Sequence, residues 1–263
     1  MTNSTDLVLY TLKDRVAIIQ LNQAESRNAM TPEMGDALAN AIGRAEKEAN
    51  AIALLGSEKA FSAGTNLKSS RLDNINANTD MGDKLEELYN PLLLKIRDLP
   101  IPLVSGISGA AAGVGCSIAL MGDIITAGKS GFFLQAFCHV GLVPDGGAAY
   151  ILSKSVGRVR AMELMLLGER YPAERAYQDG LITKIVEDSD VESTTIEHAK
   201  RLANGPAIAL ALIRKAAWSS LESSFEQQLE LDRKNQKTAG QTTDFAEGVA
   251  AFRERRKPIF KGQ

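Results

Sequence analysis

The chain has 263 residues, of which 44% are hydrophobic and 24% are charged, as in an ordinary soluble globular protein. This length fits one large domain, or one domain with a small appendage, and allows a sizeable core. The formal net charge is −2 and Lys and Arg are spread along the chain, which argues against nucleic acid or an anionic membrane as a partner. The polar N-terminus MTNSTDLVLY lacks the order of a secretion signal, so the sequence predicts a cytoplasmic protein.

The first part of the chain predicts a mixed α/β fold. Two β-like runs, residues 7–12 and 16–21, predict an antiparallel hairpin. Thr31-Pro32-Glu33 offers a hydroxyl cap, a proline at the first helical position and an acid, and so predicts a helix that continues to about residue 49. The buried stripe of this helix is expected at Met34, Leu38, Ile42 and Ala45. Residues 52–55 are then expected to form a central strand.

A glycine-rich stretch with no charge before Asp123 occupies the middle of the chain. The uncharged run of residues 101–122 has the length of a membrane span, but its proline, serines and glycines make it poorly apolar. Its Gly113-Val114-Gly115 lacks the third glycine of a dinucleotide-binding fingerprint. We therefore interpret it as a buried strand (residues 103–107), a glycine turn (residues 109–113) and a helix that begins near Val114. The first N–H groups of such a helix have no helical partner and favour developing negative charge.

Short strands and helices alternate up to about residue 190. Residues 124–126 and 181–186 predict strands, and residues 85–96, 158–167 and 172–180 predict helices. From residue 191 onward no strand pattern remains, and helices are expected at residues 191–203, 207–221, 225–239 and 244–255. We therefore divide the chain into a core, residues 1–190, and an all-helical section, residues 191–263.

The cysteines and histidines do not indicate a metal site. Cys116 and Cys138 lie in apolar surroundings without the spacing of a zinc site, so we expect both thiols to be reduced, buried and inert. His198 is expected on the surface of a helix, and His139 is a minor candidate for the functional site. Neither histidine has a second ligand at metal-binding spacing, and no metal is expected.

Three motifs, in this order and spacing, resemble the enoyl-CoA hydratase/isomerase (crotonase) superfamily over nearly the whole chain. They are Ala60-Phe61-Ser62-Ala63-Gly64-Thr65-Asn66-Leu67, Gly109-x-Ala111-x-Gly113-Val114-Gly115-Cys116-x-x-Ala119-x-x-x-Asp123 and Asp244-Phe245-x-Glu247-Gly248-x-x-Ala251-Phe252. The resemblance implies an α/β fold, a crotonase-like spiral of ββα turns, followed by a C-terminal all-helical section used for oligomerisation. It also implies a homotrimer or a hexamer.

The resemblance further implies an acyl-CoA substrate and no other cofactor. In the family, the backbone N–H groups that match Thr65 and Val114 form an oxyanion hole for the thioester oxygen, which stabilises an enolate. The family's loop that matches residues 22–30 curls around the adenine end of CoA, although this chain has Ala24 where a proline is usual and a plain connector remains the alternative. The polar residues 74–83 are expected to form a mobile loop near the acyl end.

The candidate CoA-binding residues come from both ends of the chain. The family's helical tail contributes an aromatic and a basic residue to the CoA of a neighbouring subunit. Three residues of the loop at residues 22–30, one residue of the first motif and two tail residues match CoA-binding positions: Glu25, Arg27, Ala29, Ala63, Phe252 and Arg255.

The reaction depends on the acid or base beside the oxyanion hole. The two glutamates of hydratases are replaced here by Ser117 and Phe137, neither of which moves a proton at neutral pH. Asp145 is the remaining carboxylate, and it is either a turn residue and helix cap or a catalytic residue. The pattern of residues 141–145 resembles the branch of the ring-epoxyphenylacetyl-CoA isomerases, which place their catalytic acid at this position.

We therefore expect an enoyl-CoA isomerase that shifts a double bond or a ring epoxide and uses Asp145. A hydratase or an acyl-CoA hydrolase is the alternative within the same class of enzyme. A non-catalytic acyl-CoA-binding protein is the alternative of another class.

Overall fold

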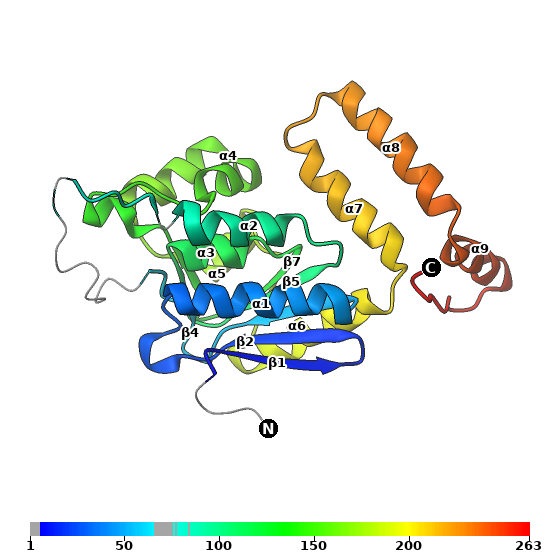
Figure 1. Cartoon of the computed structure of the whole chain (residues 1–263), viewed down its shortest axis with the longest axis horizontal. Helices are drawn as coiled ribbons and strands as arrows, with labels where there is room; N and C mark the ends of the chain where they lie inside the picture. Colours follow the sequence, from blue (N-terminus) through cyan, green and yellow to red (C-terminus); the bar gives the residue numbers. More distant parts are fainter. Residues whose placement is uncertain (1–5, 66–75, 77, 84) are drawn as a thin grey trace.

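The computed structural model describes residues 6–65, 76, 78–83 and 85–263 (Figure 1). Asn66 and Leu67 of the first motif and positions 74, 75 and 77 of the expected acyl-end loop lie outside the described residues. Within the described ranges, no helix combines the length and the apolar character needed to cross a membrane.

A six-stranded sheet forms the centre of the molecule, in the order β1-β2-β3-β5-β7-β10. The first two strands form the predicted antiparallel hairpin, and every other neighbouring pair is parallel. Strands β3 and β5 are buried along their whole length, as expected for parallel strands that are covered on both faces. The strands are β1 (Val8–Lys13), β2 (Val16–Leu21), β3 (Ala51–Leu55), β5 (Leu103–Ile107), β7 (Ile124–Gly128) and β10 (Lys184–Val186).

A second, four-stranded sheet has the order β4-β6-β8-β9, with strands β4 (Ala60–Ser62), β6 (Ala110–Ala112), β8 (Phe132–Leu134) and β9 (Tyr171–Pro172). Strands β3, β5 and β7 of the large sheet are each followed by a strand of the small sheet, which gives the predicted spiral of ββα turns. The glycine turn expected at residues 109–113 was wrong in part, because it contains β6. Three alanines are too short a run to indicate a strand by themselves.

The helices of the core cover one face of the large sheet and surround the small one: α1 (Pro32–Glu48), a π-helical turn η3 (Leu85–Tyr89), α2 (Asn90–Arg97), α3 (Val114–Leu120), α4 (Ala148–Leu167) and α5 (Ala173–Gln178). Helix α1 begins as predicted, with the Thr31 hydroxyl accepting a hydrogen bond from Met34 N–H at 3.2 Å. All four residues of its expected stripe are fully buried. Gly157, with φ 78°, interrupts the helical backbone of α4, so the predicted helix at residues 158–167 is its second part, and the part before Gly157 was not predicted.

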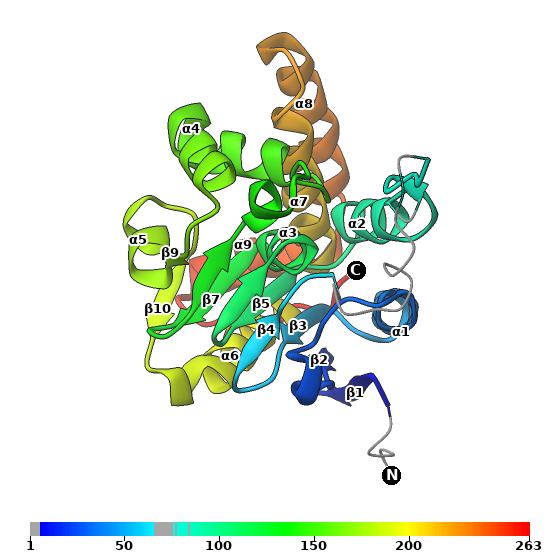
Figure 2. The ribbon, with the colours of Figure 1, turned by 90° about the vertical axis from the view of Figure 1, so that its left-hand side faces the viewer.

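Helix α6 (Val191–Ala203) covers the other face of the large sheet (Figure 2). Its Ala199 and Ala203 form a second buried cluster with Val16, Ala53 and Val104 of strands β2, β3 and β5. The all-helical section that the sequence placed at residues 191–263 therefore starts with a helix that packs on the core.

The remaining helices form an arm that extends away from the core: α7 (Ala207–Ser220), α8 (Phe225–Gly240) and α9 (Thr243–Glu254) (Figure 1). Helix α8 has no buried residue, and Arg214 is the buried residue of α7. A capping box starts α8, with Ser224 and Gln227 each accepting a hydrogen bond from the other's backbone N–H. Local capping rather than core packing therefore defines the start of this helix.

Candidate active site

Two glycines bring the segments that carry Thr65 and Val114 into contact. Strands β4 and β6 pair in parallel, so their C-terminal ends leave the small sheet side by side. A Cβ on Gly64 would lie 2.7 Å from the Ala112 carbonyl oxygen and 3.4 Å from Gly113 Cα, so only glycine allows this approach. The residues that follow these glycines, Thr65 and Val114, therefore lie on neighbouring segments.

The backbone N–H groups of Thr65 and Val114 donate no hydrogen bond to any other described residue. Gly113 N–H donates to Leu134 O at 2.9 Å, and Cys116 N–H donates to Gly113 O at 2.9 Å. The N–H of Gly113, just before Val114, is thus used in the small sheet, and the N–H of Cys116, two residues after it, is used within helix α3. The N–H of Val114 itself is available to a ligand. Two available donors on neighbouring segments have the composition of an oxyanion hole.

The Asp145 loop is attached to helix α3. Ser117, one turn after Val114, donates its hydroxyl hydrogen to the Asp145 carbonyl oxygen at 3.2 Å. A Cβ on Gly146 would lie 3.0 Å from Ser117 Cβ, so the loop packs directly on the helix. The structure therefore brings Asp145 to the same helix that supplies the Val114 N–H group.

The carboxyl group of Asp145 is buried at one of its two oxygen atoms. Its Oδ1 atom is buried and makes no hydrogen bond with the described residues. Burial raises the pKa of Asp145 from its ordinary value near 3.8 to about 6. A buried carboxyl oxygen without a partner costs stability, and a perturbed pKa of this kind is typical of functional sites.

The structure separates the two structural roles considered for Asp145. Its carbonyl oxygen accepts the Ala148 N–H at 3.0 Å, which confirms the turn. The helix cap was wrong, because Gly147 is the N-cap of α4 and no side chain caps that helix. The carboxyl group is therefore not explained by the local fold.

Ser117 and Phe137 lie beside the same backbone. Ser117 is fully buried, and the ring of Phe137, in the 3-10 helix η4 (Ala136–Val140), reaches within 3.6 Å of where a Cβ on Gly113 would stand. Both positions thus border the Val114 segment, and neither carries an acid.

The loop of residues 22–30 is fixed to the first motif. The Asn28 side chain is fully buried, donates to Ala60 O at 3.0 Å and Phe61 O at 3.2 Å, and accepts from Gln23 N–H at 2.7 Å. Ala63 N–H donates to the carbonyl oxygen of Arg27 at 2.9 Å. The sequence analysis gave Asn28 no role, although asparagine is one of the few residues that adopt its left-handed backbone, φ 53°.

The four N-terminal CoA candidates lie along this fixed loop and the adjoining motif. Glu25, on the 3-10 helix η1 (Ala24–Ser26), Arg27 and Ala63 are exposed, and Ala29 is buried. The structure brings these residues together and leaves three of their side chains accessible.

Phe252 and Arg255 are not brought to this site within one chain. They lie at the end of α9 and at its C-cap, and both are exposed, Phe252 to 86%. Helix α9 and the first turn of α1, which follows the CoA-candidate loop, lie far apart along the longest axis (Figure 1). Their contribution to the CoA of a neighbouring subunit stays a prediction.

The expected burial of Cys138 and the expected surface position of His198 were wrong. Cys138 is exposed, because the apolar run that carries it forms η4 at the surface; Cys116 is buried, and burial raises its pKa to about 12. His198 is half-buried with Nδ1 3.4 Å from the Thr126 hydroxyl, and burial lowers its pKa. His139 contacts the Leu167 carbonyl oxygen at 3.0 Å, at the end of α4. Among the described residues, no three acidic, histidine or cysteine side chains form a metal-binding cluster.

A cavity of about 920 Å³ adjoins the Asp145 loop, between helices α2, α4 and α7. Gly146 and Gly147 form part of its wall, together with apolar side chains that include Leu93, Ile151 and Trp218. Space for an apolar group thus begins directly after Asp145.

The comparisons with known proteins show the family of the chain. The family model described as Enoyl-CoA hydratase/isomerase matches residues 11–263. A protein of Rhodobacter capsulatus named a probable enoyl-CoA hydratase is 39% identical over 97% of this chain and 98% of its own length. The 1,2-epoxyphenylacetyl-CoA isomerase of Escherichia coli is 35% identical over 98% of this chain and 99% of its own length.

The fold is similar to solved structures of the same kind. The crystal structure of an enoyl-CoA hydratase from a Polaromonas species matches with a TM-score of 0.91 and 30% identity, and covers 97% of this chain and 99% of that chain. The predicted fold and the resemblance to the epoxyphenylacetyl-CoA isomerase branch are therefore confirmed. The chain belongs to the enoyl-CoA hydratase/isomerase family, the crotonase superfamily.

Proposed function

We propose that this protein is an acyl-CoA isomerase that shifts a double bond or a ring epoxide, with Asp145 as the group that moves the proton. The observation that carries the proposal is a buried Asp145 carboxyl oxygen that has no hydrogen-bond partner among the described residues, on a loop bound to helix α3. The similarity to a relative named an isomerase supports it, although other relatives are named hydratases.

The first step of the proposed mechanism is binding of the thioester oxygen by the N–H groups of Thr65 and Val114. When a proton leaves the carbon next to the thioester, negative charge moves onto this oxygen. Fixed backbone donors stabilise that charge, and loss of one such donor typically costs ~10²–10³ in rate.

Asp145 then transfers the proton. Its carboxylate takes a proton from carbon, the C–H electron pair enters the enolate, and the same proton returns to a different carbon as the double bond moves. No water is consumed, so a single acid–base group is sufficient. A base with a pKa of about 6 is largely ionised at neutral pH and is still able to return the proton.

Hydration is less well supported by the side chains at this site. Hydratases of the family use two glutamates, and Ser117 and Phe137 occupy the matching positions. The Ser117 hydroxyl is already engaged with the Asp145 backbone, and Phe137 fills space with an apolar ring.

The coenzyme A part of the substrate is proposed to lie along the fixed loop of residues 22–30. Glu25, Arg27 and Ala63 offer accessible side chains there, and the buried Ala29 offers only its backbone. Phe252 and Arg255 of a neighbouring subunit would complete this part of the site in a trimer or hexamer. The acyl group would extend past Gly146 and Gly147 toward the apolar cavity.

Asp145→Asn tests the proposal. The variant is expected to fold and bind acyl-CoA, because the turn uses the backbone of residue 145, while isomerisation falls by ~10²–10⁴. Turnover is measured on 3-enoyl-CoA and ring-derived CoA substrates, with binding and thermal melting on the same preparation. The matched control is Asp14→Asn, an exposed aspartate paired with Lys200, which should keep normal turnover. Turnover within a few-fold of the parent protein would assign the base to another group.

A further inference from the structure

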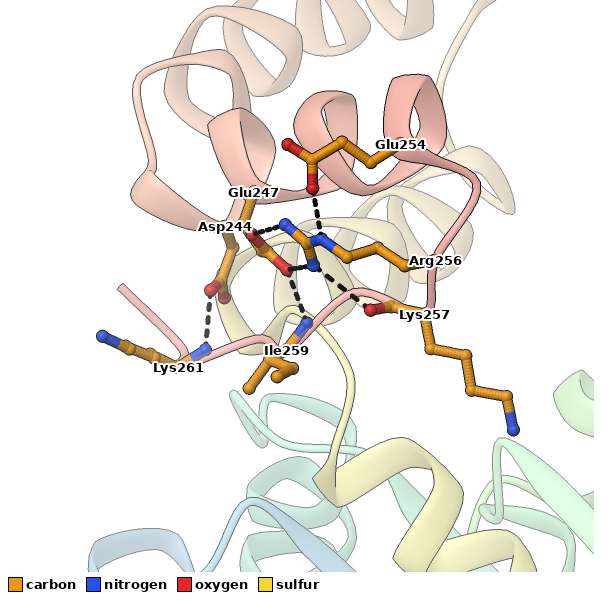
Figure 3. A network of polar contacts seen from close by, with 7 residues as sticks. All are labelled: Asp244, Glu247, Glu254, Arg256, Lys257, Ile259 and Lys261. Atoms are coloured by element: carbon orange, nitrogen blue, oxygen red, sulfur yellow. Dashed lines mark hydrogen bonds and ion pairs between the residues drawn. The ribbon is translucent and has the colours of Figure 1, made fainter.

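The segment that follows α9, residues 256–263, folds back along that helix; we call it the return segment (Figure 3). Asp244, near the start of α9 and only 4% exposed, accepts the backbone N–H groups of Lys261 at 2.7 Å and Gly262 at 2.8 Å. Asp244 N–H in turn donates to Gln263 O at 3.1 Å. The first turn of α9 therefore anchors the far end of the return segment.

Glu247, one turn further along α9, anchors the near end. Its two carboxylate oxygens accept hydrogen bonds from both terminal nitrogens of Arg256, at 2.6 and 2.9 Å. The Ile259 backbone N–H also donates to Glu247, at 2.8 Å. The bonds from Arg256 lower the pKa of Glu247 to about 2, so the carboxylate is ionised at neutral pH. One side chain thus joins two points of the return segment to the helix.

A turn with an unusual backbone lies between α9 and the return segment. Arg255 is the C-cap of α9 in the left-handed region, with φ 56° and ψ 37°. Glycine is the usual residue at such a cap, and other residues adopt this conformation only where the surroundings hold it. Arg256, the next residue, is held by its backbone bond to Ala251 O at 3.0 Å and by its side-chain bonds to Glu247. The turn sets the position of Arg255 relative to the exposed ring of Phe252.

We propose that Glu247 is a positioning residue for coenzyme A binding: it holds Arg256 and Ile259, and so fixes the turn that presents Phe252 and Arg255 to the CoA of a neighbouring subunit. This inference rests on the proposed function, in which the tail of one subunit completes the CoA site of another. A purely structural role for Glu247 would change stability and leave CoA affinity as it is.

The test compares Glu247→Ala with Glu254→Ala. Glu254 also accepts a hydrogen bond from Arg256, at 2.6 Å, but binds no backbone N–H of the described return segment. We expect Glu247→Ala to raise the Kd of free coenzyme A and the KM of a 3-enoyl-CoA about tenfold, because a charge-assisted bidentate contact is lost. The kcat and the light-scattering mass should be unchanged, and Glu254→Ala should stay within about twofold of the parent protein.

Arg256→Gln keeps the test decisive if Glu247→Ala fails to fold. It removes the guanidinium but leaves the bond from Ile259 N–H to Glu247, so a smaller increase in Kd, of about threefold, is expected. Unchanged CoA affinity in the folded variants overturns the inference, and so does a lower mass, since Glu247 would then act on assembly.

Two further variants separate this inference from the proposed function. If Arg255→Ala weakens CoA binding and the Glu247 and Arg256 variants do not, the tail site stands and the positioning role is wrong. If Arg255→Ala leaves CoA affinity unchanged while Asp145→Asn abolishes turnover, the isomerase chemistry stands and the inference about the tail is wrong.

Discussion

The core and the arm are held together by different means. In the core, strands β3 and β5 are buried along their whole length, and the candidate catalytic groups lie on segments fixed by backbone contacts and hydrogen bonds. In the arm, α8 has no buried residue, and Phe225, Phe245 and Phe252 are exposed. The candidate reaction site therefore lies in the core, whereas the arm has unburied apolar surface that a partner would cover.

A buried arginine joins the two regions, in addition to an exposed contact between Lys154 of α4 and the Leu221 carbonyl oxygen at the end of α7. Arg214 of α7 donates to Asp123 Oδ2 at 2.8 Å and to the carbonyl oxygens of Ile96 at 2.6 Å and Leu99 at 2.9 Å, and it also binds Arg97 O. These carbonyl groups lie at the C-terminal end of α2, where helical partners are missing. A single buried guanidinium thus satisfies the end of a core helix and attaches the arm.

If the core alone decides the reaction, hydration of crotonyl-CoA should be slow whatever the arm does. We expect hydration to be at least ~100-fold slower than isomerisation, because each general acid–base group contributes ~10²–10⁴ and the two glutamate positions carry Ser117 and Phe137. The loss of enoyl-thioester absorbance measures the first rate on the same enzyme used for the second. Equal rates of hydration and isomerisation would favour the hydratase alternative. The 39% identical relative is named a probable enoyl-CoA hydratase.

Arg214→Ala should separate the arm from the core. Removal of one partner from a buried ion pair typically costs about 3–5 kcal/mol, and here the α2 carbonyl groups also lose a donor. Burial raises the pKa of Asp123 even though Arg214 acts in the opposite direction, so protonation of Asp123 will reduce part of this cost. Urea unfolding of the variant and of the parent protein measures the difference in the free energy of unfolding.

Arg97→Ala is the matched control for this change, since its pair with Asp98 is exposed and such pairs contribute about 0–1 kcal/mol. Equal losses for the two variants would mean that the arm is attached by its apolar contacts, such as Trp218 against the core, and not by Arg214.

The exposed apolar surface of the arm predicts that the protein forms an oligomer. A trimer or hexamer, three or six times the 28.2 kDa of one chain, is expected by light scattering at micromolar concentration. The unburied apolar side chains of α8 and α9 motivate this expectation. A monomer would remove the partner that is proposed to complete the CoA site with Phe252 and Arg255.

The sequence predicted elements well where one local signal decides them. The cap at Thr31 and the apolar stripe of α1 needed only the helical period, and α6 has the predicted bounds. Strand β6 and the part of α4 before Gly157 were missed, because β6 is set by pairing with β4 and β8 and the helical backbone of α4 is interrupted at Gly157. Long-range pairing is not visible in a short run of alanines.

The candidate site shows the same division. The motifs located Thr65 and Val114, and the resemblance located Asp145, so the residues were predicted before their contacts were known. The bond from Ser117 to the Asp145 backbone and the anchoring of the loop by Asn28 were not predicted. Each joins residues that are distant in sequence, and no local pattern reports such a contact.

The smallest expected effect concerns the stability of the core at the Asp145 site. The folded-state pKa of about 6 lies above the ordinary value of 3.8, so between these pH values the folded protein binds more protons than the unfolded chain. Stability contributed by this group is therefore present below about pH 4 and is lost as the pH rises through 6. Asn at position 145 does not titrate, so Asp145→Asn should melt higher than the parent protein at pH 8, with the difference shrinking toward pH 4.

Because the carboxyl group is only partly buried, solvent screening reduces the effect to roughly 1 kcal/mol. The two proteins are melted side by side at both pH values, which cancels the titration of every other group. A difference in melting temperature that is the same at pH 4 and pH 8 would show that the pKa of Asp145 is not raised in the folded protein. A raised pKa would then no longer support Asp145 as the base.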